Sequence, residues 1–129
     1  MSNRYKKSED LLIRAEKTIP LGSQTFSKSK TQLPLNVSPY FASHASGALL
    51  YDVDGNEYID FMGSLAAISL GYNDPDVTLA VEKQLKKGAI FSLATELESI
   101  VAEQICEMVP CAEMVRFGKN GTDATSGAI

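Results

Sequence analysis

The stretch MVRFGKNGTDAT, residues 114–125, joins a short apolar run to a polar loop and then to small residues. We predict a strand over Met114–Phe117 and a helix that begins after the loop. The first amides of a helix have no partner within it, and the helix dipole is positive there, so such a loop can bind an anion. Gly121 would let the backbone approach a ligand, in dihedral angles closed to other residues, while Thr122 offers a hydroxyl and Asn120 an amide. A phosphate group would fit these donors.

A second interpretation of this loop needs no ligand. Thr122 or Asp123 caps the helix, and Gly121 only allows the turn. The loop matches neither the phosphate-binding pattern G-x-x-x-x-G-K-[ST] nor the dinucleotide pattern G-x-G-x-x-G, which disfavours a nucleoside triphosphate or NAD. Lys119 is a nearby cation, but an isolated lysine in a polar loop is commonly solvated. The residue spacing alone leaves both interpretations open.

The N-terminal half of the chain predicts a helix, a long loop and a hairpin. In chain order, the helix, the loop and the two strands are expected at Ser8–Thr18, 21–46, Ala48–Val53 and Glu57–Met62. Ser8 is suited to cap the helix, and Pro20 ends it. Asp54-Gly55 between the two β-prone runs is a strong hairpin signal. A loop of this length in a compact domain is uncommon unless it has a function.

Two more helices are expected in the C-terminal half. The first has Asp74 as its N-cap, Pro75 at the first helical position and Gly88 as a left-handed cap. The second begins at Thr95, which is spaced from Glu98 as in a capping box. Both segments carry apolar residues at helical spacing.

Composition and charge narrow the class of protein. The chain has 129 residues, 44% hydrophobic and 22% charged, which is typical of a soluble globular domain. Its net charge of −4 disfavours a nucleic-acid partner, and no apolar run approaches the roughly 18 residues that span a membrane. No secretory signal is visible. Cys106 and Cys111 have no second pair, which argues against a zinc site or a disulfide framework. We therefore expect a cytoplasmic protein with no metal and no membrane partner.

Five segments in collinear order resemble the class III aminotransferases, which belong to the fold-type-I enzymes that use pyridoxal 5′-phosphate (PLP). The segments are RAEKTIPLGS, GALLYDVDGNEYIDF, LGYNDPDV, TELE and MVRFGKNGTDAT. They resemble most the branch that contains the glutamate-1-semialdehyde 2,1-aminomutases. The resemblance implies an α/β fold with an N-terminal helix, an antiparallel hairpin and then the start of the large α/β domain. It assigns residues 1–73 to the N-terminal segment and part of the small domain, and residues 74–129 to the start of an incomplete PLP-binding domain.

The same resemblance assigns residues to the cofactor. The loop that holds the PLP phosphate in this family, usually S-G-T-E, is similar to Asn120, Gly121, Thr122 and Asp123 here. Asparagine in place of serine keeps a short polar side chain, and aspartate in place of glutamate keeps a negative charge at a helix start. The first three of these residues are therefore implied to bind the cofactor.

Candidate substrate residues depart from the aminomutase pattern. Lys28 stands where the aminomutases have a carboxylate-binding arginine, and Leu65, after Ser64, stands where they have a tryptophan. Lysine pairs with a carboxylate as a point charge and cannot form the planar two-bond clamp. These departures favour an aminotransferase acting on another carbonyl compound, including a sugar-linked one. In the alternative, Lys28 faces solvent and Leu65 is ordinary core.

No catalytic residue is assigned within the chain, because the family's Schiff-base lysine is expected beyond residue 129. A lone predicted strand cannot form a parallel sheet, so we expect a truncated piece of a longer protein, inactive by itself. The longer protein is implied to be a homodimer that takes a small amino donor and a carbonyl acceptor. An aminomutase and a non-catalytic remnant or binding module remain the alternatives.

Overall fold

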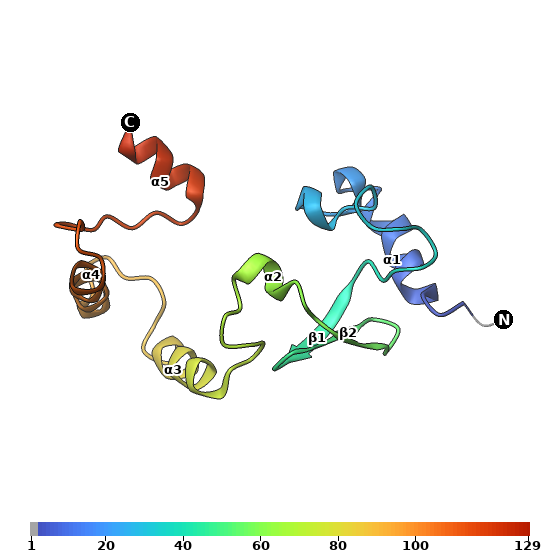
Figure 1. Ribbon diagram of the computed structural model, residues 1–129, viewed down its shortest axis with the longest axis horizontal. Helices are drawn as coiled ribbons and strands as arrows, with labels where there is room; N and C mark the ends of the chain where they lie inside the picture. Colours follow the sequence, from blue (N-terminus) through green and yellow to red (C-terminus); the bar gives the residue numbers. More distant parts are fainter. Residues whose placement is uncertain (1–2) are drawn as a thin grey trace. The chain divides into compact units, whose positions relative to one another are not determined.

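The computed structural model describes residues 3–129, in two compact units, one ending at Lys83 and one beginning at Gln84. Figure 1 shows the elements in chain order. The helices and strands are α1 (Lys6–Ala15), β1 (Ala42–Ser46), β2 (Leu49–Asp52), β3 (Glu57–Ile59), α2 (Gly63–Ala66), α3 (Pro75–Leu85), α4 (Glu96–Met108) and α5 (Gly121–Ala128), with short 3₁₀ turns at Pro20–Gly22 and Phe26–Lys28. The predicted division between residues 73 and 74 concerns the whole protein and stays a prediction.

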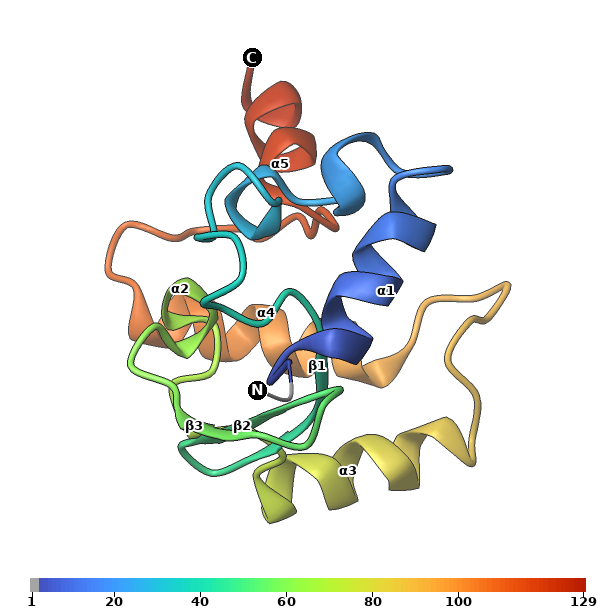
Figure 2. The same cartoon turned by 90° about the vertical axis from the view of Figure 1, so that its right-hand side faces the viewer.

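The first unit contains an antiparallel sheet in the order β1-β2-β3, labelled in Figure 2. The predicted hairpin is confirmed: Leu50 pairs with Tyr58 across it, and Gly55 in the turn has φ +88°. The left-handed φ explains why glycine follows Asp54 at this turn. The expected unstructured loop over residues 21–46 is wrong where it includes β1 and the 3₁₀ turns. The sequence of β1, ASHAS, has little β propensity, and its pairing with β2 makes it a strand.

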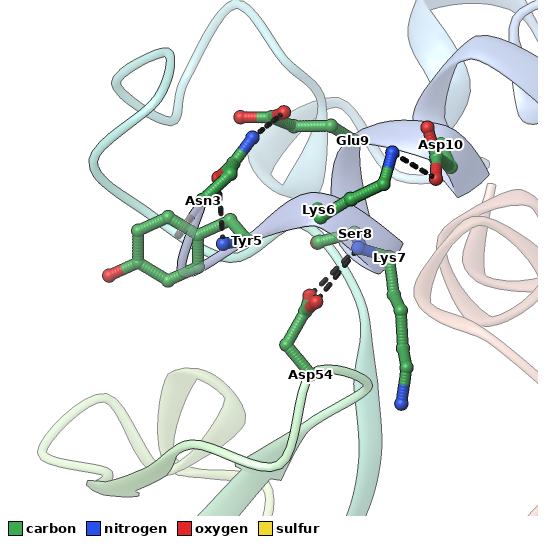
Figure 3. Close-up of polar contacts among 8 residues, drawn as sticks. All are labelled: Asn3, Tyr5, Lys6, Lys7, Ser8, Glu9, Asp10 and Asp54. Atoms are coloured by element: carbon green, nitrogen blue, oxygen red, sulfur yellow. Dashed lines mark hydrogen bonds and ion pairs between the residues drawn. The ribbon is translucent and has the colours of Figure 1, made fainter. Parts of the chain in front are cut away.

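Helix α1 begins two residues before the predicted start, and Ser8 does not cap it. Ser8 is fully buried, and its hydroxyl oxygen accepts a hydrogen bond from the Tyr40 amide at 2.7 Å. The cap comes from the hairpin turn instead. The Asp54 carboxylate accepts hydrogen bonds from the amides of Lys7 at 2.7 Å and Ser8 at 2.9 Å, as Figure 3 shows. A side chain distant in sequence thus satisfies two of the unpaired amides at the helix start.

Asp52 shapes the turn that carries Asp54. One carboxylate oxygen accepts from the amides of Asp54 at 3.0 Å and Asn56 at 2.7 Å. The other accepts from the Asn56 side chain at 2.7 Å and from the Tyr58 hydroxyl at 2.8 Å. Burial, with only 3% of the residue exposed, raises the pKa of Asp52, but these hydrogen bonds outweigh burial and hold the pKa below its usual value.

The core of the first unit lies around α1 and is partly polar. Tyr5 and Leu12 are its buried apolar residues, and the buried polar residues are Ser8, Ser29 and Asp52. Gly22 packs against this core with φ +75°, and a Cβ there would lie 2.5 Å from Leu12 Cδ1. Both the backbone angle and the close approach therefore require glycine at this position.

The helical predictions for the C-terminal half are confirmed. The Asp74 side chain accepts from two amides of α3, each at 3.1 Å, and Pro75 is its first residue. Gly88 has φ +119°, and its amide donates to carbonyls of the last turn of α3. Thr95 and Glu98 form the predicted capping box at the start of α4. These signals are local, so they act wherever the helix is placed.

The strand predicted over Met114–Phe117 is wrong for the structure described. This segment runs between α4 and α5 without strand pairing to any residue within 3–129. A strand needs a neighbour for its backbone hydrogen bonds, and an apolar run alone does not supply one. The following helix begins at Gly121, two residues before Asp123.

Removing the Asp54 cap should loosen α1. We expect Asp54→Ala to cost about 1 kcal/mol of local stability, because the Lys7 and Ser8 amides lose their acceptor. Hydrogen–deuterium exchange of peptides covering α1, in the protein encoded by the whole gene, should quicken roughly fivefold. Asp10→Ala is the matched control, since Asp10 makes only an exposed pair with Lys6. Equal exchange in the two variants would contradict the cap.

The Asp52 network should be sensitive to acid. Its carboxyl has a lowered pKa in the folded state, so the stabilisation is present above the ordinary pKa of the unfolded chain and is lost as pH falls through the folded value. Asp52→Asn cannot titrate. We expect its deficit in melting temperature, relative to the unsubstituted protein, to shrink as the pH falls from about 6 to about 3. A constant or growing deficit would show that the charge on Asp52 does not stabilise the turn.

Candidate cofactor and substrate site

Asn120 is the N-cap of α5. Its backbone is extended, with φ −142° and ψ 171°, and its side-chain oxygen accepts from the Asp123 amide at 3.1 Å. The Asp123 carboxylate accepts in return from the amides of Asn120 and Lys119, each at 3.2 Å. This is a capping box. The N-cap is therefore Asn120 and not Thr122 or Asp123, which both lie within the helix, although Asp123 takes part in the cap through its side chain.

Two adjacent amides at the start of α5 remain free. The capping box engages the amides of Asn120 and Asp123, and the Ala124 amide donates to the Asn120 carbonyl at 3.2 Å. No acceptor within residues 3–129 pairs with the amides of Gly121 and Thr122. They therefore present two donors at the positive end of the helix dipole.

Gly121 contributes space, not an unusual backbone angle. Its φ is not positive, so the expectation that it adopts dihedrals closed to other residues is wrong. A Cβ at Gly121 would meet no atom within 4 Å, so there is open space beside the backbone at this residue. The Thr122 hydroxyl adds a third donor beside the two free amides. Backbone amides and a hydroxyl at a helix start are donors of the kind that bind phosphate groups.

Ser64 and Leu65, the candidate substrate residues of the first unit, lie in a left-handed turn. The φ angles from Gly63 through Ala66 are +51°, +51°, +59° and +67°. Each residue other than glycine costs roughly 1–2 kcal/mol in this region, so the turn needs external support. Such strained residues cluster at binding sites. Leu65 is 72% exposed, so it is not part of the core formed by residues 3–129.

Asp60 and Tyr72 support this turn, and the sequence analysis did not identify them. One Asp60 oxygen accepts from the amides of Met62 at 2.8 Å and Gly63 at 3.2 Å, and the other accepts from the Tyr72 hydroxyl. The Tyr72 hydrogen bond holds the pKa of Asp60 below its usual value, and the carboxylate raises the pKa of Tyr72. An aspartate three residues before a glycine, just after a strand, is a turn signal that could have identified Asp60.

Lys28, the third candidate substrate residue, lies at the end of the Phe26–Lys28 turn. Its side chain is exposed, in line with the alternative in which it faces solvent. Within residues 3–129, no hydrogen bond or ion pair joins Lys28 to Ser64 or Leu65. Within the first unit, Ser64 lies beside Leu65 in the turn, while Lys28 shares no polar contact with either residue; Asn120, Gly121 and Thr122 lie together at the start of α5 in the second unit.

Over residues 3–129, no three histidine, cysteine or acidic side chains gather as a metal site would require. Over the same residues, no helix has both the length and the apolar character needed to cross a membrane.

Known proteins resemble this chain both in sequence and in fold. The profile of the family Aminotransferase class-III matches residues 32–129. The chain is 44% identical to glutamate-1-semialdehyde 2,1-aminomutase 2 of Lachnoclostridium phytofermentans, over 95% of this chain and 28% of the relative. It is 42% identical to the glutamate-1-semialdehyde 2,1-aminomutase of Alkaliphilus oremlandii, over 96% and 29%. The chain therefore spans between a quarter and a third of the length of these relatives.

Among solved structures, an omega-transaminase from Sphaerobacter thermophilus superposes with a TM-score of 0.85 at 35% identity, over 95% of this chain and 27% of that one. A glutamate-1-semialdehyde-aminomutase from Pseudomonas aeruginosa has a TM-score of 0.72 at 23% identity, over 84% and 23%, and shows the fold alone. The predicted fold class, the N-terminal part of a fold-type-I transferase, is confirmed. On the extent of the profile match, the chain belongs to the class III aminotransferase family.

Proposed function

We propose that this chain is part of a PLP-dependent aminotransferase that moves an amino group between a small amino donor and a carbonyl acceptor. The observation that carries the proposal is the pair of free amides at Gly121 and Thr122, in an open turn at the start of α5. Family membership gives this anion site its ligand, since class III aminotransferases use PLP. Bound PLP supplies the electron sink for amino-group transfer.

Each residue of the loop has a distinct task in this proposal. Asn120 and Asp123 fix the first turn of α5 through the capping box, which engages neither of the two amides between them. Gly121 and Thr122 then hold the phosphate through their amides and the Thr122 hydroxyl. Asn120 also offers its side-chain Nδ2, which donates to no acceptor within residues 3–129. The arrangement orients the cofactor before the substrate arrives, so no reorganisation is needed on binding.

Further parts of the proposal rest on family membership. Lys28, Ser64 and Leu65 contact the substrate, the protein is a cytoplasmic homodimer, and residues 1–73 and 74–129 belong to its small and large domains. The 129 residues alone are expected to be inactive, because they span less than a third of the relatives' length. Nucleic-acid and membrane partners are not part of the proposal.

A glutamate-1-semialdehyde 2,1-aminomutase is the second candidate, favoured by the 44% and 42% identity to proteins with that name. Lys28 and Leu65 weigh against it, because a lysine cannot reproduce the two-bond grip of an arginine on a carboxylate. The protein encoded by the whole gene should be assayed with glutamate semialdehyde, with and without 2-oxoglutarate. Turnover without any external amino acceptor would identify the mutase. Turnover that depends on an acceptor would identify the transaminase.

Gly121→Pro should weaken PLP binding by removing one free amide. Proline is well tolerated at the first helical position, and the extended Asn120 backbone suits a residue before proline, so the helix should persist. A lost hydrogen bond to a charged group is worth about 1.5–3 kcal/mol, so the Kd for PLP should rise by about ten- to 150-fold. Titration of the visible absorbance of the bound cofactor, in the protein encoded by the whole gene, measures this.

Gly121→Ala is the matched control, because it keeps the amide and its Cβ would meet no atom of the chain within 4 Å. We expect it to change the Kd much less than proline does. Pyridoxal without the phosphate should bind equally to both variants. Equal PLP affinity in the proline and alanine variants would refute the phosphate role of this amide. A protein with no visible absorbance at any PLP concentration would instead favour a non-catalytic remnant or binding module.

A further inference from the structure

We propose that Asp60 and Tyr72 are positioning residues that hold Ser64 and Leu65 in their left-handed conformation and thereby set where the substrate contacts this turn. The proposal rests on the proposed function, in which Ser64 and Leu65 face the substrate. It adds two residues to the site that neither touch the substrate nor were expected from the sequence pattern.

The turn holds three residues in an unfavourable backbone conformation. Three successive residues with side chains, Ser64, Leu65 and Ala66, have φ between +51° and +67°, where an L-residue crowds its own carbonyl. Inside the turn, the Leu65 amide donates to the Met62 carbonyl at 2.9 Å, while Ala67 donates to the Ser64 carbonyl at 3.3 Å and Ile68 to the Gly63 carbonyl at 3.4 Å, the last two at the long end of the hydrogen-bond range. One backbone bond of ordinary length offsets only part of the cost of three left-handed residues, so contacts with residues around the turn matter for its conformation.

Asp60 supplies that support at the point where the turn begins. Its Oδ1 accepts from the amides of Met62 at 2.8 Å and Gly63 at 3.2 Å, which fixes the direction in which the chain leaves β3. Its Oδ2 accepts from the Tyr72 hydroxyl. One carboxylate thus connects the first residues of the turn to a residue that follows it. A bond between a phenol and a carboxylate is charge-assisted and short, which makes it a firm connection.

Both ends of the segment are also fixed to the same turn of the sheet. The Asp60 amide donates to the Ala48 carbonyl at 2.9 Å, and Tyr72 and Gly47 exchange two backbone hydrogen bonds of 2.8 Å each. Gly71 has φ +91°, and a Cβ there would lie 3.1 Å from the Gly47 carbonyl oxygen. Residues 60–72 therefore form a loop closed at its base by backbone pairing and by the Asp60–Tyr72 bond.

The closed base leaves the tip of the loop exposed. Ser64 and Leu65 are both exposed there, Leu65 to 72%. A loop with a fixed base and an exposed, strained tip is preorganised for contact, because its entropy is lost on folding and not on binding. Without the Asp60–Tyr72 bond the turn should relax toward right-handed angles, moving both side chains without removing either.

Tyr72→Phe tests this with two readouts in the protein encoded by the whole gene. Hydrogen–deuterium exchange of a peptide spanning residues 60–72 should quicken about tenfold, because the turn loses its connection to Tyr72. In steady-state kinetics the KM for the substrate should rise about five- to tenfold while kcat changes by less than about twofold, the pattern of lost ground-state binding. The visible absorbance of bound PLP should stay unchanged, since the phosphate loop is not altered.

Asp60→Asn is the second variant, and it retains an oxygen for the Met62 and Gly63 amides while losing the charge that binds Tyr72. Like Tyr72→Phe, it should quicken exchange and raise KM. The proposal can therefore still be tested if the phenylalanine variant fails to fold. Tyr51→Phe is the matched control, because Tyr51 lies on β2 and stacks on His44 instead of joining the loop. It should leave both readouts unchanged.

The outcomes separate this inference from the function on which it rests. If the unsubstituted protein shows no bound PLP and no turnover, the proposed function fails and the positioning role fails with it. If that protein binds PLP and turns over, but Tyr72→Phe and Asp60→Asn leave exchange unchanged, only the inference fails. It also fails if exchange quickens while KM stays constant, or if kcat falls together with bound PLP, since the bond would then be merely structural.

Discussion

The Asp54 carboxylate on the first amides of α1 is the contact on which the first unit depends. It joins residues 46 and 47 positions apart, and it works only because Asp52 has shaped the hairpin turn that presents it. Few apolar side chains are buried here, so polar contacts of defined geometry, not the volume of a core, select the arrangement. Helix and hairpin thus specify each other: the helix lacks an acceptor without the turn, and the turn's exposed carboxylate lacks donors without the helix.

The parts of the fold that could be predicted are those whose energy is local. Asp54-Gly55, Asp74 before Pro75, and Thr95 with Glu98 place donors and acceptors within a few residues of one another, so the sequence alone contains both partners. The start of α1 and strand β1 depend on partners elsewhere in the chain, and no local pattern reports them. The strand prediction for Met114–Phe117 was wrong for the opposite reason. Its composition favours a strand, but no strand within residues 3–129 pairs with it.

The candidate site was likewise predictable only where its signals are local in the sequence. A strand-like run, a glycine and a hydroxyl residue indicated an anion site at Asn120–Thr122, and the resemblance gave it a ligand. The separate roles of these residues were not predictable: the side-chain Oδ1 of Asn120 builds the cap, and the proposal assigns the phosphate to the next two amides, the Thr122 hydroxyl and the Asn120 Nδ2. Asp60 and Tyr72 were missed because their effect passes through a backbone angle, and a left-handed φ at serine or leucine contradicts the propensity of both residues.

The turn at Ser64 and Leu65 and the loop at Asn120–Thr122 each need a glycine, but for different physical reasons. The two regions should therefore differ in which substitutions they tolerate. At Gly63 the positive φ is the requirement, so the chain can enter a left-handed turn that the following residues then continue at a cost. At Gly121 the angle is ordinary and only the missing side chain matters. In the proposed function, the loop at Asn120–Thr122 therefore needs only space and free amides, which a well-capped helix start provides. The proposed role of the turn at Ser64 and Leu65 needs specific support from Asp60 and Tyr72, so it should tolerate fewer substitutions around it.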